Sequence, residues 1–209
     1  MTKKLFFLIL ILVIIPISTF CAEEKNKNSG KSFHLGIYSG LGTSGAFYSD
    51  GDSIKRTDFS FNPGVRFSYF RTNDFSFMAI ADIGYLQVHY ITQVGALTYE
   101  THQIREFVNI NLMAGINYKY LYATGGFFIA PITNAWRWDE VEIVNMTGDY
   151  TSDFGLVVEV GAKIPLGDFT FFIGLNVRFG FIDVHSRDAT SMTNLWTVYG
   201  VIGMTYAIF

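Results

Sequence analysis

Residues 154–181 read FGLVVEVGAKIPLGDFTFFIGLNVRFGF, and nearly every second side chain in this run is apolar. Such a period of two is typical of β-strands, whose successive side chains point to opposite faces. The segment Pro-Leu-Gly-Asp at 165–168 has turn-forming chemistry, so the run predicts two antiparallel strands joined by a tight turn. One face of this hairpin is apolar, and the other carries glycines, polar residues and the charged Glu159, Lys163 and Arg178.

The composition favours a membrane protein. Charged residues make up 16% of the 209 residues and aromatic residues 17%, with 21 Phe and 12 Tyr, whereas soluble domains have about 25% charged residues. The net charge of −3 gives no basic face, so nucleic-acid binding is not expected. The single cysteine, Cys21, excludes a disulfide framework or a thiolate zinc site in the domain that follows it.

The N-terminus has the layout of a secretory signal peptide. Lys3 and Lys4 precede an apolar run from 5 to 15, which is shorter than the roughly 18 residues of a spanning helix, and small residues lead to Cys21. We predict that residues 1–21 are removed, which changes the net charge from −3 to −5 because two lysines are lost. The alternative is a lipoprotein acylated at Cys21. Residues 22–31 are predicted to be a disordered polar lead-in to a single domain at 32–209.

Eight segments with period-two character follow. They lie at 32–42, 59–70, 75–92, 104–118, 121–131, the two halves of 154–181, and 195–209. Tight turns at 71–74, 119–120 and 165–168 alternate with long polar loops at about 43–58, 93–103, 132–153 and 182–194. The phase of 121–131 is ambiguous, and the alternation slips at Leu86, Val88 and Tyr90, which predicts a bulge or the exit of that strand from the membrane.

The apolar face of these segments is interpreted as lipid-facing. A soluble eight-stranded barrel would turn this face inward and cover its outside with Lys and Glu, but the polar face here consists mainly of Gly, Ser, Thr and Asn. Short turns at one end and long loops at the other are typical of outer-membrane barrels. The sequence therefore predicts an all-β fold: an eight-stranded antiparallel up-and-down transmembrane β-barrel with short periplasmic turns and long extracellular loops, in the outer membrane of a diderm bacterium.

Five charged residues on the polar face are predicted to project into the lumen: Arg66, Asp82, Glu159, Lys163 and Arg178. Isolated charges there would be costly, so we expect them to pair with one another and with Asn109 and Asn176. The favoured hypothesis is a structural polar plug. The alternative is a gated, charge-lined path for small solutes, and a catalytic carboxylate pair is not favoured because arginines leave no room for a substrate.

Three further motifs carry a resemblance to a family. Asp-Ile-Gly-Tyr at 82–85, Phe-Val-Asn-Ile-Asn-Leu at 107–112, and Asp-Phe-Gly-Leu at 153–156 with Lys-Ile-Pro-Leu-Gly at 163–167 are similar to motifs of the PorT-type outer-membrane β-barrel family. The resemblance implies an eight-stranded barrel of OmpX-like architecture. It implies no activity, because proteins that share a fold need not share a function.

The chain offers few candidates for chemistry. His185-Ser186, with Asp183 and Asp188 nearby, superficially suggests a hydrolase, but neighbouring side chains in a strand diverge. His34, His89 and His102 lie on separate segments, and packing is favoured over metal ligation. No catalytic residue, cofactor or metal site is therefore predicted.

The loop at 132–153 concentrates aromatic and charged residues at one place. Those expected to form a surface-interaction loop are Trp136, Arg137, Trp138, Asp139, Glu140 and Glu142. The segment alternates well enough to extend its strands above the membrane. It is interpreted as an ordinary solvated acidic loop, as a girdle tryptophan beside cations that bridge lipopolysaccharide, or as a protruding edge that pairs with a strand of another protein.

These observations favour a non-enzymatic outer-membrane barrel with a structural or surface-interaction role. The alternative is a small channel or hydrophobic-ligand conduit, and a lipid A-modifying enzyme is a remote third. The expected partners are membrane lipid, lipopolysaccharide, a surface protein, and the barrel-assembly machinery, whose recognition signal the terminal Phe209 resembles.

Overall fold

The computed structural model describes residues 33–48, 53–70, 75–94, 100–138, 142–182 and 193–208. The predicted signal peptide, Cys21, the lead-in at 22–31 and Phe209 lie outside the described residues. No helix among those residues is long and apolar enough to cross a membrane.

Ten strands and one short 3-10 helix make up the described chain. The strands are β1 (Phe33–Tyr48), β2 (Ser53–Phe70), β3 (Ser76–Val94), β4 (Glu100–Tyr118), β5 (Leu121–Ala130), β6 (Ile132–Trp138), β7 (Ile143–Asn145), β8 (Asp153–Leu166), β9 (Phe169–Gly180) and β10 (Thr193–Ala207), and the helix η1 is Thr147–Asp149. All strand pairs are antiparallel.

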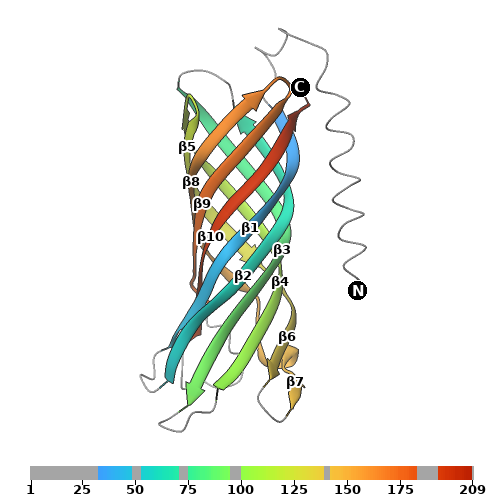
Figure 1. Ribbon diagram of the computed structural model, residues 1–209, viewed down its shortest axis with the longest axis vertical. Helices are drawn as coiled ribbons and strands as arrows, with labels where there is room; N and C mark the ends of the chain where they lie inside the picture. Colours follow the sequence, from blue (N-terminus) through green and yellow to red (C-terminus); the bar gives the residue numbers. More distant parts are fainter. Residues whose placement is uncertain are drawn as a thin grey trace.

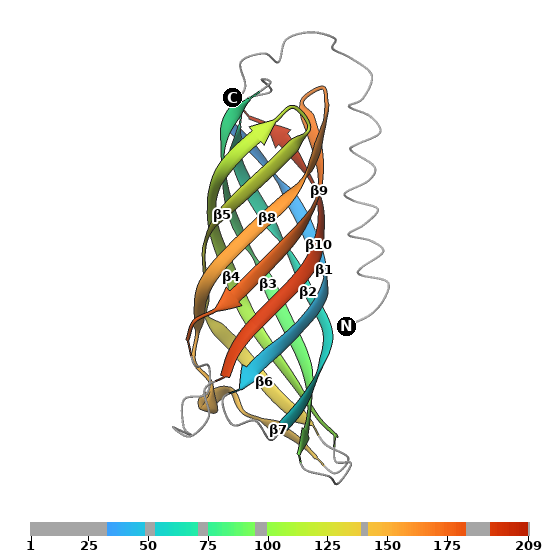
Figure 2. The same cartoon turned by 90° about the vertical axis from the view of Figure 1, so that its left-hand side faces the viewer.

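The strands form a single sheet that curls back on itself. Its order is β3-β2-β1-β10-β9-β8-β5-β4-β6-β7, and β3 also pairs with β4, so eight strands follow one another in a ring while β6 and β7 continue from β4. Figures 1 and 2 show these strands tilted around a common axis, with β6 and β7 at the end opposite the tight β8–β9 turn. Gly167 lies in that turn with φ +65°, a conformation that a glycine adopts without strain.

Alternation along each strand separates an apolar outside from a polar inside. In β8 and β9 the apolar side chains predicted to face lipid are exposed, among them Val158 (50%), Ile164 (54%) and Ile173 (59%), while Glu159, Lys163 and Arg178 are buried inside. The ambiguous β5 resolves in the same way, because Leu121, Phe127 and Ile129 are exposed and Tyr122 and Phe128 are buried. The exterior of the ring is therefore an apolar wall.

Two sequence-based expectations are wrong in detail. The pattern of β3 does not slip at Leu86, Val88 and Tyr90, because all three continue the inward phase and pack in the lumen. The bulge lies instead on β2, between Thr57 and Ser60. Much of the predicted loop at 43–58 and part of that at 93–103 is strand, because β1 to β4 extend beyond the apolar band, where alternation loses its contrast. The segment 132–153 extends as strands, as its alternation indicated, in the β6–β7 hairpin.

Inward-facing glycines make room for aromatic rings. A Cβ added at Gly161 or Gly174 would lie 2.7 or 2.8 Å from the Tyr122 side chain, and at Gly64 it would lie 2.7 Å from the Tyr38 ring. Large and small side chains therefore alternate across the lumen and fill it.

Candidate functional site

The centre of the lumen holds a buried ion-pair cluster around Arg66. Its Nε and Nη2 donate to the two oxygens of Asp82 at 2.8 Å each, and its Nη1 and Nη2 donate to Glu159 at 2.7 and 2.9 Å. All three side chains are at most 2% exposed. One guanidinium thus contacts two carboxylates in the paired geometry that favours Arg over Lys.

Neighbouring groups complete the hydrogen bonds of Glu159. Tyr122 donates its hydroxyl proton at 2.7 Å, and the Asn176 amide donates at 2.8 Å. The Phe172 ring lies 4.4 Å from the Arg66 guanidinium carbon, so the cation is also held against an aromatic face. Because each charge of this cluster has several partners, the arrangement is rigid and fixes the register of opposite strands.

Lys163 and Arg178 are also inside the lumen, but they do not join this cluster. Lys163 Nζ lies 3.9 Å from the centroid of Phe70, and the Arg178 guanidinium carbon lies 3.8 Å from that of Phe128. Within the part of the chain that the structure describes, the nitrogens of both side chains lack a hydrogen-bond partner. Among the described residues, Lys163 and Arg178 therefore form none of the expected ion pairs with the other lumen charges, and both cations lie on aromatic faces.

Arg105 is a lumen residue that the sequence analysis missed. It is 1% exposed, donates to the Tyr90 hydroxyl, and lies 3.9 Å from the Tyr150 ring. The signal was available, because Arg105 shares the inward phase of Asn109 and Asn111 on β4. Together with Tyr90, Phe107 and Phe128 it fills the outer end of the lumen.

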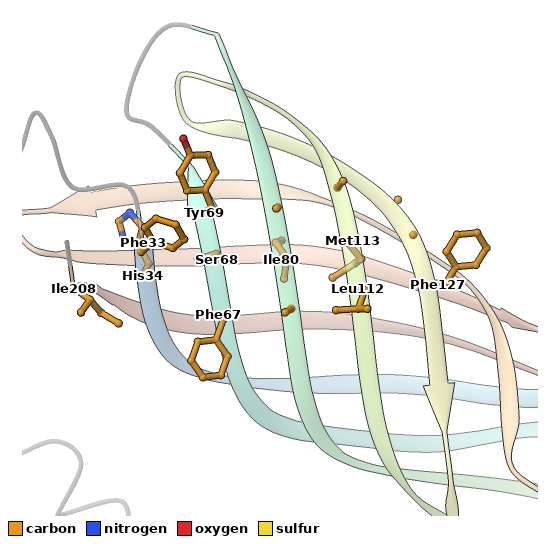
Figure 3. Close-up of a pocket in the computed structure, with 15 residues that line it drawn as sticks. Phe33, His34, Phe67, Ser68, Tyr69, Ile80, Leu112, Met113, Phe127 and Ile208 are labelled. Carbon is orange, nitrogen blue, oxygen red and sulfur yellow. The ribbon is translucent and has the colours of Figure 1, made fainter.

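Two cavities inside the described part of the barrel each measure about 10 Å³, one beside Arg178 and Asp153 and the other between Arg66, Lys163 and Phe172. A volume of this size holds about one water molecule. The larger hollow, about 640 Å³, is an open groove whose lining includes the outward-facing Ala79, Ala81 and Ala114. Phe67, Tyr69 and Phe127 lie around this groove (Figure 3), which therefore lies on the wall and not along the axis.

The predicted surface-interaction loop forms the β6–β7 hairpin. Trp136 pairs with Asn145 and Trp138 with Ile143, and these two tryptophans are 38% and 40% exposed. Arg137 lies on the opposite face of β6 from the two tryptophans. Glu142 directly precedes β7 and is exposed. Asp139 and Glu140 lie outside the described residues. Ile143, the first residue of β7, is 72% exposed at this end of the molecule.

The structure buries His34 and brings His89 and His102 into contact. His34 is buried and stacks on Phe70 at 4.0 Å, so its packing role is as expected. His89 and His102, however, are brought together by the β3–β4 pairing, with His102 Nδ1 3.3 Å from His89 Nε2, and Asp58 Oδ2 lies 3.0 Å from His89 Nδ1. These two histidines do lie on separate segments, β3 and β4, but nothing in the sequence indicated that the two strands bring them into contact. His185, Ser186, Asp183 and Asp188 lie outside the described residues.

Comparisons with known proteins identify no family. No protein-family model matches, and no curated protein matches, so membership in the PorT-type family stays a prediction. Among solved structures, Neisserial surface protein A is 13% identical with a TM-score of 0.46, covering 84% of this chain and 97% of that one. Ail of Yersinia pestis is 14% identical (TM-score 0.39, coverage 83% and 99%), and OprG of Pseudomonas aeruginosa is 13% identical (TM-score 0.38, coverage 87% and 98%).

Such distant likenesses carry no argument about function, and the assignment rests on the architecture. A tilted antiparallel ring with an apolar exterior, a polar interior and tight turns at one end is the construction of outer-membrane β-barrels of diderm bacteria. The protein is a transmembrane β-barrel, and its place is the outer membrane.

Proposed function

We propose that the protein is a non-enzymatic, eight-stranded outer-membrane barrel whose lumen is closed and whose role is played at the cell surface. The filled lumen carries this proposal. Arg66, Glu159 and Tyr199 occupy its middle at 2% exposure or less. The cavity beside Arg66 and the cavity beside Arg178 each hold about one water. A channel or a hydrophobic-ligand conduit needs a continuous path, which these side chains obstruct.

Planar-bilayer recording tests the closed lumen. The mature protein, inserted into a bilayer, is expected to give no reproducible conductance steps. The matched control is a variant with Arg66→Ala, Glu159→Ala and Tyr199→Ala, which removes bulk from the centre and is expected to conduct if it folds. Stable steps from the wild type would lead us to abandon the proposal in favour of a channel.

The surface role is assigned to the β6–β7 hairpin. The β7 strand pairs with β6 on one side, and among the described strands no other strand pairs with it. Such an edge can accept a strand from a partner protein, and the exposed Trp136, Trp138 and Ile143 supply apolar contact area beside it.

Site-specific photocrosslinking on intact cells tests this role. A photoreactive residue at position 143 is expected to form protein adducts, while the same residue at position 112, on the lipid-facing wall, is not. Equal adduct formation at both positions, or none at 143, would contradict a role for this edge. Absence of any change in lipid A mass on expression is the expected result for a protein without lipid A-modifying activity.

A further inference from the structure

The outer ends of β2, β3 and β4 carry three side chains whose chemistry is that of a metal site. Asp58, His89 and His102 come from three adjacent strands, and one potential ligand atom from each lies within 4.8 Å of the others. All three residues are partly exposed. Imidazole nitrogens with a carboxylate suit Zn²⁺ and its neighbours in the first transition series.

The bulge on β2 creates this cluster. Thr57 pairs with Tyr90 and Ser60 with Val88, so Asp58 and Phe59 together oppose His89. The extra residue turns Asp58 toward the outward face that His89 occupies, which a regular strand would not do. The Phe59 amide donates to Asp58 Oδ1 at 2.7 Å and leaves Oδ2 to face His89 at 3.0 Å.

The two imidazoles are already spaced as metal ligands. Asp58 Oδ2 accepts a hydrogen bond from the Nδ1–H group of His89. The lone pair on Nε2 of His89 can then act as a metal ligand. His102 Nδ1 lies 3.3 Å from this Nε2. Two nitrogens at 2.0–2.1 Å from a tetrahedral zinc ion are about 3.3–3.4 Å apart, so the separation of these two nitrogens matches that of two ligands of one ion.

The cluster lies above the lipid-facing band. Outward-facing residues on β4 are apolar from Ile116 to Val108 and are followed by Glu106, whose carboxylate accepts a hydrogen bond from Asn134 at 2.9 Å. A carboxylate on the outer wall indicates the upper limit of the hydrocarbon, because a charge there is costly. His102 lies four residues further along β4, so ions from the medium can reach the site.

We propose that His89 and His102 bind one Zn²⁺ on the outer wall of the barrel, with Asp58 as the residue that positions His89. His89 binds through Nε2 and His102 through Nδ1, so the bound His102 carries its proton on Nε2. Water molecules complete the coordination. Trp138, the last residue of β6, stacks on His102 at 4.7 Å, so the ion also braces the end of β6 that leads into the β6–β7 connection.

Titration calorimetry of the tag-free, folded barrel with Zn²⁺ tests the proposal. The wild type is expected to bind one Zn²⁺ per chain, and His89→Ala and His102→Ala are each expected to lose saturable binding. Asp58→Asn is expected to weaken binding about tenfold, as the loss of an orienting carboxylate does. His185→Ala is the matched control and should bind like the wild type. Heat-modifiable gel mobility verifies that each variant folds.

A second measurement needs no variant at the ligands. Zn²⁺, but not Mg²⁺, is expected to protect His89 and His102 from diethylpyrocarbonate, read by mass spectrometry, and to change the fluorescence of Trp138 in a Trp136→Phe, Trp196→Phe background. Absence of saturable binding by the wild type, or modification of both histidines at the same rate with and without Zn²⁺, overturns the proposal. Unchanged affinity of Asp58→Asn overturns the positioning role of Asp58.

Discussion

Arg66 on β2 and Glu159 on β8 meet across the full width of the barrel, with 2.7 Å between Nη1 and Oε1. Their strands are separated by three strands in either direction around the ring, so the contact joins opposite walls. The same guanidinium holds Asp82 on the neighbouring β3 at 2.8 Å. One buried cation therefore ties three strands together.

Arg66→Met is expected to destabilise the barrel by about 3–5 kcal/mol, because it leaves Asp82 and Glu159 buried without their cation. Urea unfolding in lipid vesicles, followed by tryptophan fluorescence, measures the change. The control adds Asp82→Asn and Glu159→Gln to Arg66→Met, and this triple variant should recover most of the loss. A single variant as stable as the wild type would contradict the cluster.

Lys163→Met is expected to stabilise the barrel, in contrast to Arg66→Met. Lys163 Nζ is buried against Phe70 without a hydrogen-bond partner among the described residues, so an apolar side chain of similar length should stabilise the barrel by about 1–2 kcal/mol. The same unfolding assay measures it, and the exposed Lys119→Met serves as control. A loss comparable to that of Arg66→Met would show that Lys163 is part of the central ion-pair network.

Leu112→Arg tests the position of the membrane. Leu112 is 61% exposed on the outward face of β4, and an arginine near the bilayer middle should cost about 2–4 kcal/mol. Gln87→Arg, beside Glu106 above the apolar band, should cost only about 0–1 kcal/mol. Unfolding in lipid vesicles measures both losses of stability. Equal losses for Leu112→Arg and Gln87→Arg would contradict this position of the lipid-facing band.

Gly174→Ala tests the packing of Tyr122. A Cβ at this position would lie 2.8 Å from the Tyr122 hydroxyl oxygen and 2.9 Å from the Val160 carbonyl oxygen, so we expect a loss of about 1–3 kcal/mol. The matched control is Gly125→Ala, where the nearest atom is 3.9 Å away and little change is expected. A neutral Gly174→Ala would indicate that Tyr122 moves freely.

The sequence was most informative where the two faces of a strand differ strongly. Glu159, Lys163 and Arg178 were placed in the lumen because their neighbours on β8 and β9 are apolar. On β3 the contrast between the two faces is lost from Leu86 onward, because Leu86 and Val88 face an apolar part of the lumen. This loss of contrast suggested a shift in the alternation, although the alternation continues unchanged.

The histidine cluster shows a second limit of prediction from the sequence. His89 lies near the end of the predicted strand 75–92 and His102 within the predicted loop 93–103, and their proximity depends on the extension of β3 and β4 beyond the membrane. The contribution of Asp58 depends on a single extra residue in β2, which leaves no trace in the alternation. Sequence periodicity reports which face a residue occupies but not its neighbours on the adjacent strand.

The two carboxylates that contact Arg66 lie at very different distances from it along the chain. Asp82 lies 16 residues away on the other arm of the β2–β3 hairpin, whereas Glu159 lies 93 residues away. The β2–β3 hairpin by itself contains both members of the Arg66–Asp82 pair, so this arginine can be neutralised within one hairpin. The contact with Glu159 also needs β8, so it exists only when the two halves of the chain have come together, and its presence reports the assembled barrel.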